Sequence, residues 1–136
     1  MRNLALVTLA AIVIATIGCG GPKVVRDVDE YLTATGRGVA KPGLSEGEGR
    51  RYAEGQAEAE AIRMLTDMAK SVQVTDRKTC LDYWIESEIV RAKIKSICSA
   101  AEVVTRRFSE DGHEAEVVIR VPVRTVRTIC LGAEKK

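Results

Sequence analysis

The sequence predicts an α+β domain, in which a mostly antiparallel sheet of about four strands packs against a long, alanine-rich helix and a second helix follows. Three observations predict this class. Short segments alternate apolar with polar residues, as strands with one buried face do. Apolar residues, several of them alanine, recur at spacings of three and four along one segment, which is the periodicity of a helix face. An Asp-Gly pair separates the last two strand patterns, as in a hairpin turn.

The first half of the domain supplies one strand and the long helix. Residues 28–39 alternate tyrosine and threonine with apolar residues, which predicts a strand. Ser45 and Glu48 have the spacing of a capping box, in which each side chain caps the backbone N–H of the other, so we expect a helix over residues 45–71. The face of this helix that points to the sheet contains Ala53, Ala57, Ala61, Leu65, Met68 and Val72.

The middle of the chain predicts a short strand and a second helix. Residues 72–75 alternate valine with polar residues, and a polar turn follows them. Residues 82–96 fit a helix whose buried face would contain Ile85, Ile89 and Ala92.

The last third of the chain predicts a hairpin. Residues 102–108 and 114–123 have clear strand patterns, and residues 109–113 form the turn between them because Asp and Gly tolerate positive backbone angles. Apolar residues within 126–131 predict a short closing segment, and residues 132–136 form a polar tail.

The composition fits one globular domain, residues 28–131, and no nucleic-acid partner. The chain has 136 residues, of which 46% are hydrophobic and 29% charged, and its formal net charge is +2. Basic residues are spread among nearly equal numbers of acidic ones, so no face of the kind that binds a phosphate backbone is expected. Aromatic residues make up only 4% of the chain, which argues against a surface that stacks nucleic-acid bases.

Residues 1–18 have the pattern of a secretory signal peptide. Arg2 precedes an apolar run over residues 4–17, which only two threonines interrupt. The run is too short to span a bilayer, because a transmembrane helix needs roughly 20 apolar residues. Glycines and Pro22 follow it and break the helical pattern.

The end of this segment, Thr16-Ile17-Gly18-Cys19, resembles the lipobox of bacterial lipoproteins. The resemblance implies cleavage between Gly18 and Cys19, lipid on Cys19, and a tether over residues 19–27. Two or more acyl chains are enough for stable membrane anchoring. Gly20 replaces the Asp that commonly retains lipoproteins in the inner membrane, so we expect an outer-membrane anchor with the domain in the periplasm or at the surface. The alternatives are an ordinary cleaved leader with a coincidental Cys, and an uncleaved anchor.

Three cysteines, Cys80, Cys98 and Cys130, remain once Cys19 carries lipid. In an oxidising compartment one disulfide and one free thiol is the simplest expectation. If a continuous helix separates Cys80 from Cys98, these two lie about 20 Å apart, and Cys130 is then the better partner for one of them. The alternative is that all three are small buried apolar residues.

No group of residues in the sequence supports an enzyme, a metal site or a cofactor. His113 is the only His, and its position in the predicted turn favours a solvated residue over a catalytic base. Metal binding by cysteines would require closer spacing, such as C-x-x-C, which is absent. Tyr83-Trp84 is either a half-buried structural pair or a site that binds a partner.

The order of these features resembles the LPP20-like bacterial lipoproteins, which are related to the amino-terminal domain of the flagellar assembly protein FlgT. The matching features are a strand ending in Gly36-Arg37-Gly38, an alanine-rich helix before Leu65, the segment Val72-Gln73-Val74, and the strand, Asp-Gly turn and strand over residues 101–123. The alanines of the match are Ala53, Ala57, Ala59 and Ala61. The resemblance covers roughly residues 28–125.

This resemblance implies a small α+β domain in a surface or periplasmic lipoprotein, sometimes associated with flagella or adhesion, and it implies no catalytic residues. We therefore expect a membrane-anchored envelope lipoprotein with a non-catalytic structural, assembly or protein-binding role and an envelope protein as its partner. The alternative is a carrier or sensor that binds a small molecule between the helix and the sheet, which would require a pocket there.

Overall fold

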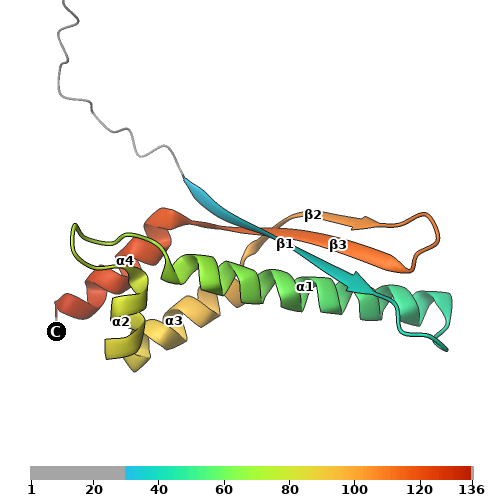
Figure 1. The fold of residues 1–136 in the computed structure, drawn as a ribbon, viewed down its shortest axis with the longest axis horizontal. Coiled ribbons are helices and arrows are strands. Elements are labelled where there is room, and N and C mark those ends of the chain that lie inside the picture. Colours follow the sequence, from blue (N-terminus) through green and yellow to red (C-terminus); the bar gives the residue numbers. More distant parts are fainter. Residues whose placement is uncertain (1–29, 136) are drawn as a thin grey trace, which may run out of the picture.

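A three-stranded antiparallel sheet packs along one long helix, and three shorter helices gather at one end (Figure 1). The computed structural model describes residues 30–135. The strands lie side by side in the order β1–β3–β2. The predicted α+β class, with an antiparallel sheet against a long alanine-rich helix, is confirmed. In chain order the elements are β1 (Tyr31–Val39), α1 (Glu46–Lys70), α2 (Cys80–Glu86), α3 (Glu88–Ser99), β2 (Glu102–Phe108), β3 (Glu114–Pro122) and α4 (Val123–Glu134).

The described part of the chain has three strands rather than the predicted four, because residues 72–75 do not join the sheet. Gln73 makes only an isolated bridge with Thr79. The backbone N–H of Val74 donates to the carbonyl of Lys78 at 3.0 Å. The segment satisfies its backbone polar groups through the turn that leads from α1 into α2 and through Arg127, whose Nε donates to the carbonyl of Gln73 at 3.0 Å, so its backbone requires no strand as a partner.

Helix α1 lies so close to β1 that backbone contacts backbone. A Cβ atom on Gly36 would lie 1.8 Å from the carbonyl oxygen of Ala57, and one on Gly38 would lie 1.9 Å from that of Ala53. Glycine on the strand and alanine on the helix are therefore required for this approach. The two glycines were predicted to end the strand, but they lie inside β1. Gly36 pairs with Val117 of β3, and Gly38 pairs with Ala115.

Side chains of α1 also cover the free edge of β1. The backbone N–H of Arg37 donates to Oε2 of Glu60 at 2.7 Å, and that of Val39 donates to Oε1 of Gln56 at 3.2 Å. An edge strand with open N–H groups invites pairing with another chain, and these two helix side chains block that pairing at the end of β1.

The β2 edge is held to α1 by charged side chains. A register shift between Val103 and Thr105 turns Arg106 toward the helix, where its Nε lies 2.7 Å from Oε1 of Glu54. The guanidinium of Arg50 lies 5.7 Å from the centre of the Phe108 ring. Helix α1 is thus fastened to both edges of the sheet as well as to its inner face.

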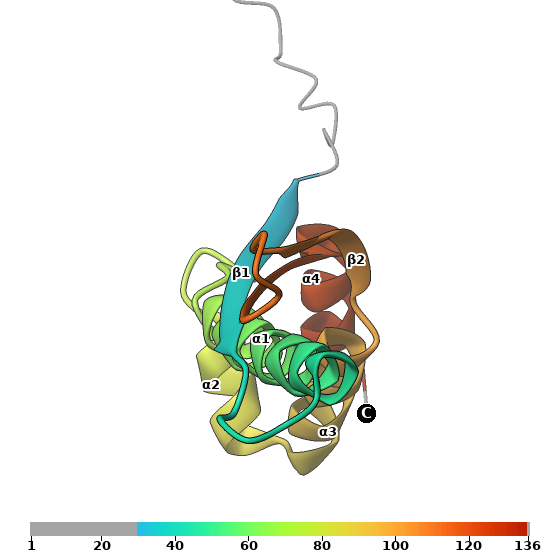
Figure 2. The same cartoon turned by 90° about the vertical axis from the view of Figure 1, so that its right-hand side faces the viewer.

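The outer face of the sheet is not covered by α1, α2 or α3, which all lie on the other side (Figures 1 and 2). Ion pairs cross this face from strand to strand, with Arg37 3.4 Å from Glu116 and Arg120 2.7 Å from Glu102. The Arg120 guanidinium also lies over the Tyr31 ring at 4.3 Å. The outer residues of β1 are Tyr31, Thr33, Thr35, Arg37 and Val39.

The helix predicted over residues 82–96 is two helices, because the chain breaks at Ser87. The backbone of Ser87 is extended, with φ −131° and ψ 115°, and its hydroxyl accepts the N–H of Val90 as the N-cap of α3. The break shifts the helical phase, so the predicted buried face is wrong. Ile85, Ile89 and Ala92 are all exposed. The buried residues of α3 are instead Val90, Ile94 and Cys98.

The hairpin and the capping box agree with the sequence. Gly112 has a positive φ of 71°, and the N–H of Ser109 donates to the carbonyl of Glu114 at 2.9 Å to close the turn. The Ser45 and Glu48 side chains cap the start of α1 reciprocally.

After β3, the predicted short closing segment is a 12-residue helix, α4, which continues to Glu134 and into the expected polar tail. Its buried residues Val123, Val126 and Cys130 have helical spacing.

Candidate functional site

The predicted lipid-attachment residue Cys19 and the cleavage-site residue Gly18 lie outside the described residues. The described chain begins at Glu30, whose carbonyl accepts the N–H of Val123 at 2.8 Å. This bond places the start of β1 beside the start of α4, at the end of the molecule where the short helices gather (Figure 1). None of the helices within residues 30–135 has the length and apolarity needed to cross a membrane.

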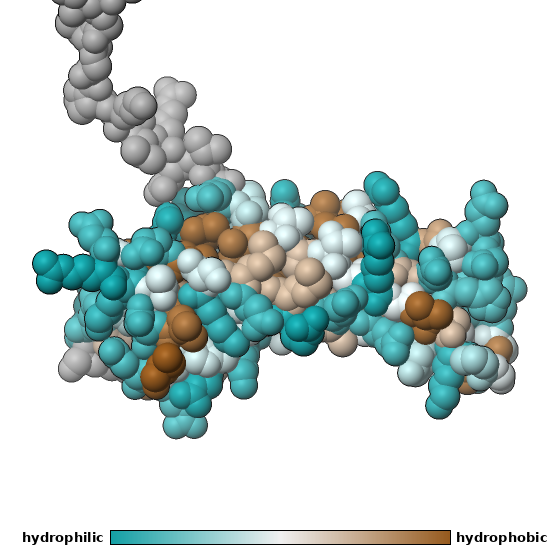
Figure 3. Space-filling view, in the orientation of Figure 1, coloured by the Kyte–Doolittle hydropathy of each residue, from teal (hydrophilic) through white to brown (hydrophobic). Residues whose placement is uncertain are grey.

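Exposed apolar side chains gather at the same end, over α2 and α3, where Figure 3 shows brown atoms among hydrophilic ones. We name this the α2–α3 apolar surface and define it as Leu81, Ile85 and Ile89, which are 43%, 67% and 55% exposed. Leu81 and Ile85 are four residues apart on α2 and therefore share one side of that helix. Beside Ile89, a hollow of about 180 Å³ separates α3 from α4 and reaches Gly132.

Two aromatic residues of α2, Tyr83 and Trp84, lie next to this surface in the chain. Tyr83 is buried, and its hydroxyl donates to Oε1 of Glu134 at 2.5 Å, which joins α2 to α4. This hydrogen bond raises the pKa of Tyr83 to about 12. Trp84 is half-buried, with the ammonium groups of Lys70 and Lys95 4.7 and 5.8 Å from its ring centre. The pair thus has a structural part in holding α2.

The three cysteines are all buried and carry free thiols. Cys80 on α2 and Cys130 on α4 form a hydrogen bond with each other, which lowers the pKa of Cys80 and raises that of Cys130. Burial raises the pKa of Cys98, whose thiol contacts Thr66 of α1. The structure therefore brings Cys80 and Cys130 together, while the thiol of Cys98, which also lies near Cys80, is hydrogen-bonded to Thr66. No group of residues that could hold a metal ion occurs among residues 30–135.

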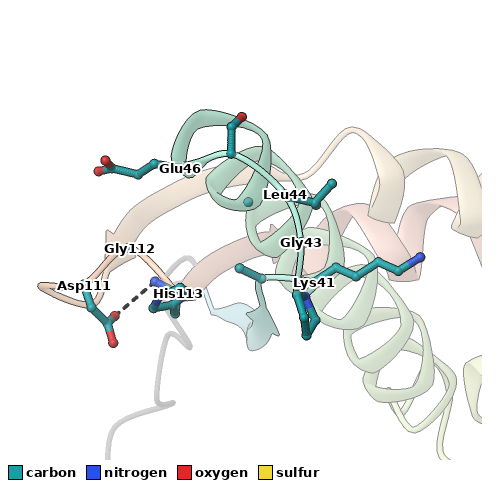
Figure 4. Close-up of a pocket in the computed structure, with 11 residues that line it drawn as sticks. Lys41, Gly43, Leu44, Glu46, Asp111, Gly112 and His113 are labelled. Atoms are coloured by element: carbon teal, nitrogen blue, oxygen red, sulfur yellow. Dashed lines mark hydrogen bonds between the residues drawn. The ribbon is translucent and has the colours of Figure 1, made fainter.

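A pocket of about 470 Å³ lies at the opposite end of α1, between the loop before the helix and the β2–β3 turn (Figure 4). Its charged side chains do not converge, since Lys41 and Glu46 extend in opposite directions. Asp111 accepts the backbone N–H of His113 at 3.0 Å and the hydroxyl of Ser109 at 2.5 Å. The hydrogen bond from Ser109, together with that from the His113 backbone, lowers the pKa of Asp111, and both bonds hold the turn closed.

Little space remains between α1 and the sheet. Along the middle of β1 the contact of Gly36 and Gly38 with the helix backbone leaves no room for a ligand. At the end of this interface a groove of about 390 Å³ opens beside Leu32, Met68 and Val123. It is a lateral opening at the end of α1 rather than a chamber between the helix and the sheet.

The α2–α3 apolar surface is the feature that sequence reasoning missed, since Ile85 and Ile89 were assigned to the core. The signal that would have revealed it is Ser87 followed by Glu88, because serine and an acidic residue are typical of a helix start. Comparison of the chain with models of protein families, with curated proteins and with solved structures gives no significant match.

Proposed function

We propose that this chain is an envelope lipoprotein, exported by residues 1–18 and anchored in the outer membrane through lipid on Cys19, and that it acts without catalysis by binding another envelope protein. The leader and the lipobox-like Thr16-Ile17-Gly18-Cys19 support the anchor. The pattern shared with LPP20-like lipoproteins supports the same class. The observation that carries the binding role is the exposure of Ile85 and Ile89 on the α2–α3 apolar surface.

This surface has the anatomy of a protein interface. Its exposed aliphatic side chains lie on the consecutive helices α2 and α3, and exposed charged residues, including Glu86, Glu88 and Lys93, neighbour them in the chain. Clustered apolar side chains of this kind mark interaction sites more often than single exposed ones do. Burying both isoleucines against a partner would contribute roughly 2–4 kcal/mol, given their fractional exposure, which corresponds to about 30- to 800-fold in affinity before the entropic cost of association is subtracted.

The tether and the surface lie at the same end of the domain. Cys19 and Glu30 are eleven residues apart in the chain, and eleven extended residues span at most about 37 Å. A lipid on Cys19 would therefore tether this end of the domain to the membrane, and a partner in or on the same bilayer would lie within reach of the α2–α3 apolar surface.

Site-specific crosslinking in cells tests the binding role. A photo-crosslinking amino acid is placed at residue 89 of the full-length protein, and at residue 107 as a matched control, since Arg107 is exposed on the outer face of the sheet. We expect one protein adduct of defined size from residue 89, none from residue 107, and loss of the adduct when Ile85→Asp is added. Equal adducts from both positions, or adducts with lipid alone, would refute the binding surface.

The anchor is tested separately by fractionation and intact mass of wild type and Cys19→Ala. We expect a membrane-bound wild type that is heavier by its acyl groups, and a variant that stays an unprocessed precursor. A wild type that is recovered without lipid in the soluble fraction would overturn the anchor but not the binding surface.

A further inference from the structure

Two of the three thiols in the core lie against each other although they are distant in the chain. Cys80 is the first residue of α2 and Cys130 lies in the third quarter of α4, and both side chains are 0% exposed. Neither thiol has a part in the binding surface described above. A contact between two buried cysteines of different helices is unusual enough to require an explanation, because single buried cysteines serve equally well as small apolar residues.

Bonds on both sides fix the two helices in this position. The N–H of Cys80 donates to the carbonyl of Val72 at 2.8 Å, which holds the start of α2. Tyr83, three residues further on, is bonded to Glu134, four residues beyond Cys130. A disulfide requires Cα atoms within about 7 Å and side chains that point at each other. The Tyr83–Glu134 bond joins α2 to α4 about one helical turn from each cysteine, and both cysteine side chains are fully buried in the same core, which favours both conditions.

We propose that Cys80 and Cys130 form a structural disulfide in the mature protein and that Cys98 remains a thiol. This inference rests on the proposed function, because the bond persists only in an oxidising compartment such as the bacterial envelope. Cys98 also lies near Cys80, but it is on α3 and its thiol is hydrogen-bonded to Thr66 of α1, so we assign the bond to Cys130.

The oxidant is a protein disulfide of the thioredoxin-like oxidoreductase class. The thiolate of one cysteine attacks a sulfur of the oxidant's disulfide and forms a mixed disulfide, and one oxidant thiolate leaves. The thiolate of the second cysteine then attacks the first cysteine's sulfur, which releases the other oxidant thiolate. The pair loses two electrons and two protons, and the oxidant becomes a dithiol. Since both sulfurs are fully buried in the folded domain, the exchange precedes the docking of α2 on α4.

The bond would hold the end of the molecule that carries the binding surface. Helix α2 has only seven residues, too few to be stable as a helix without tertiary contacts. Leu81 directly follows Cys80, so a bond from Cys80 to α4 fixes the first residue of the α2–α3 apolar surface. A disulfide between Cys80 and Cys130 closes a long loop of the chain, and we expect it to raise Tm by on the order of 10 °C relative to the reduced protein.

The pairing is tested on full-length protein recovered from the envelope. The cells are quenched with acid, the protein is denatured without reductant, free thiols are blocked with N-ethylmaleimide, and peptides are identified by mass spectrometry. We expect a linked peptide pair containing Cys80 and Cys130 and one blocked thiol, Cys98. The Cys98→Ala variant keeps the linked pair, whereas Cys130→Ala leaves Cys80 blocked. Three blocked thiols in exported protein, or any bond to Cys98, would overturn the pairing.

A second arm separates this outcome from failure of the proposed function. The purified full chain is reduced, unfolded in denaturant and refolded with oxidised glutathione, so that both thiols are accessible, and we expect the loss of two hydrogen atoms and the same linked peptides. If the protein in cells is neither exported nor lipidated, Cys19 is found modified by N-ethylmaleimide, and the proposed function fails. The refolding experiment with glutathione then decides the pairing by itself. The Tm of oxidised wild type, compared with that of the same protein after reduction, gives the Tm shift without a substitution that could impair folding. An unchanged Tm contradicts the structural role.

Discussion

Replacing Gly36 with alanine tests the closest contact in the fold. The added Cβ would lie 1.8 Å from the carbonyl oxygen of Ala57, and ordinary contact begins near 3.4 Å, so α1 would have to withdraw by the difference of 1.6 Å. The obstacle is a backbone carbonyl, which cannot rotate aside as a side chain can. Withdrawal would also stretch the 2.7 Å hydrogen bond between the Arg37 N–H and Glu60.

The expected cost follows from opposing terms. Overpacking of a core costs about 1–3 kcal/mol, and losing the hydrogen bond adds about 1 kcal/mol. Alanine is favoured over glycine inside a strand by roughly 0.5–1 kcal/mol, which offsets part of this cost. We therefore expect Gly36→Ala to lower the free energy of unfolding by about 3 kcal/mol, since the rigid carbonyl places the overpacking term near its upper limit.

Urea unfolding of the purified protein, followed by far-ultraviolet circular dichroism, measures this change. Gly55→Ala is the matched control, because it adds the same methyl group inside α1 where nothing lies within 4 Å. Helix propensity predicts that the control stabilises the protein by about 1 kcal/mol. A Gly36→Ala protein as stable as wild type would refute the close packing of α1 on β1.

Three further predictions address other contacts. Tyr83→Phe should lower the free energy of unfolding, because it removes the hydrogen bond to Glu134. This bond raises the pKa of the phenol to about 12, so the difference from wild type should be full below a pH of about 10 and vanish as the pH rises toward 12. Urea unfolding across this pH range measures the difference, and a difference that stays constant would contradict the prediction. Ser45→Ala should cost about 1 kcal/mol in the same assay through loss of the α1 N-cap, and no loss would dispute the capping box. Ile94→Ala should lower the free energy of unfolding by about 2–5 kcal/mol, because Ile94 is buried, and Ile89→Ala should lower it by under about 0.5 kcal/mol, because Ile89 is exposed. The reverse order would mean that Ile89 faces the core, as the sequence predicted.

Local patterns were sufficient for much of the fold. The capping box at Ser45, the alanine face of α1 and the Asp-Gly turn each depend on residues close together in the chain, and all three occur in the structure. The role of Gly36 and Gly38 depends on a contact between β1 and α1, which are joined by a loop of variable geometry. Their spacing on alternate strand positions fits one strand face, but only the packed structure shows that α1 occupies it.

The errors concentrate between α1 and β2. A continuous helix over residues 82–96 satisfies the apolar periodicity of Ile85 and Ile89 as well as a broken one does, because three apolar positions do not fix the phase across a break at Ser87. The expected distance between Cys80 and Cys98 assumed that continuous helix, and the assumption is wrong because the helix breaks at Ser87. The contact of Cys80 with Cys130 depends on α4, where the sequence predicted only a short closing segment over residues 126–131.

The two halves of the molecule differ in how they are held, and this difference bears on function. The sheet and α1 are joined by backbone contact at Gly36 and by side chains at both sheet edges. The short helices α2 and α3 depend on capping residues, the Tyr83–Glu134 bond and the Cys80–Cys130 contact. If these helices carry the binding surface, loss of the disulfide should weaken crosslinking from residue 89 before it unfolds the sheet. Simultaneous loss of binding and of sheet structure on reduction would instead show that both halves unfold as one cooperative unit.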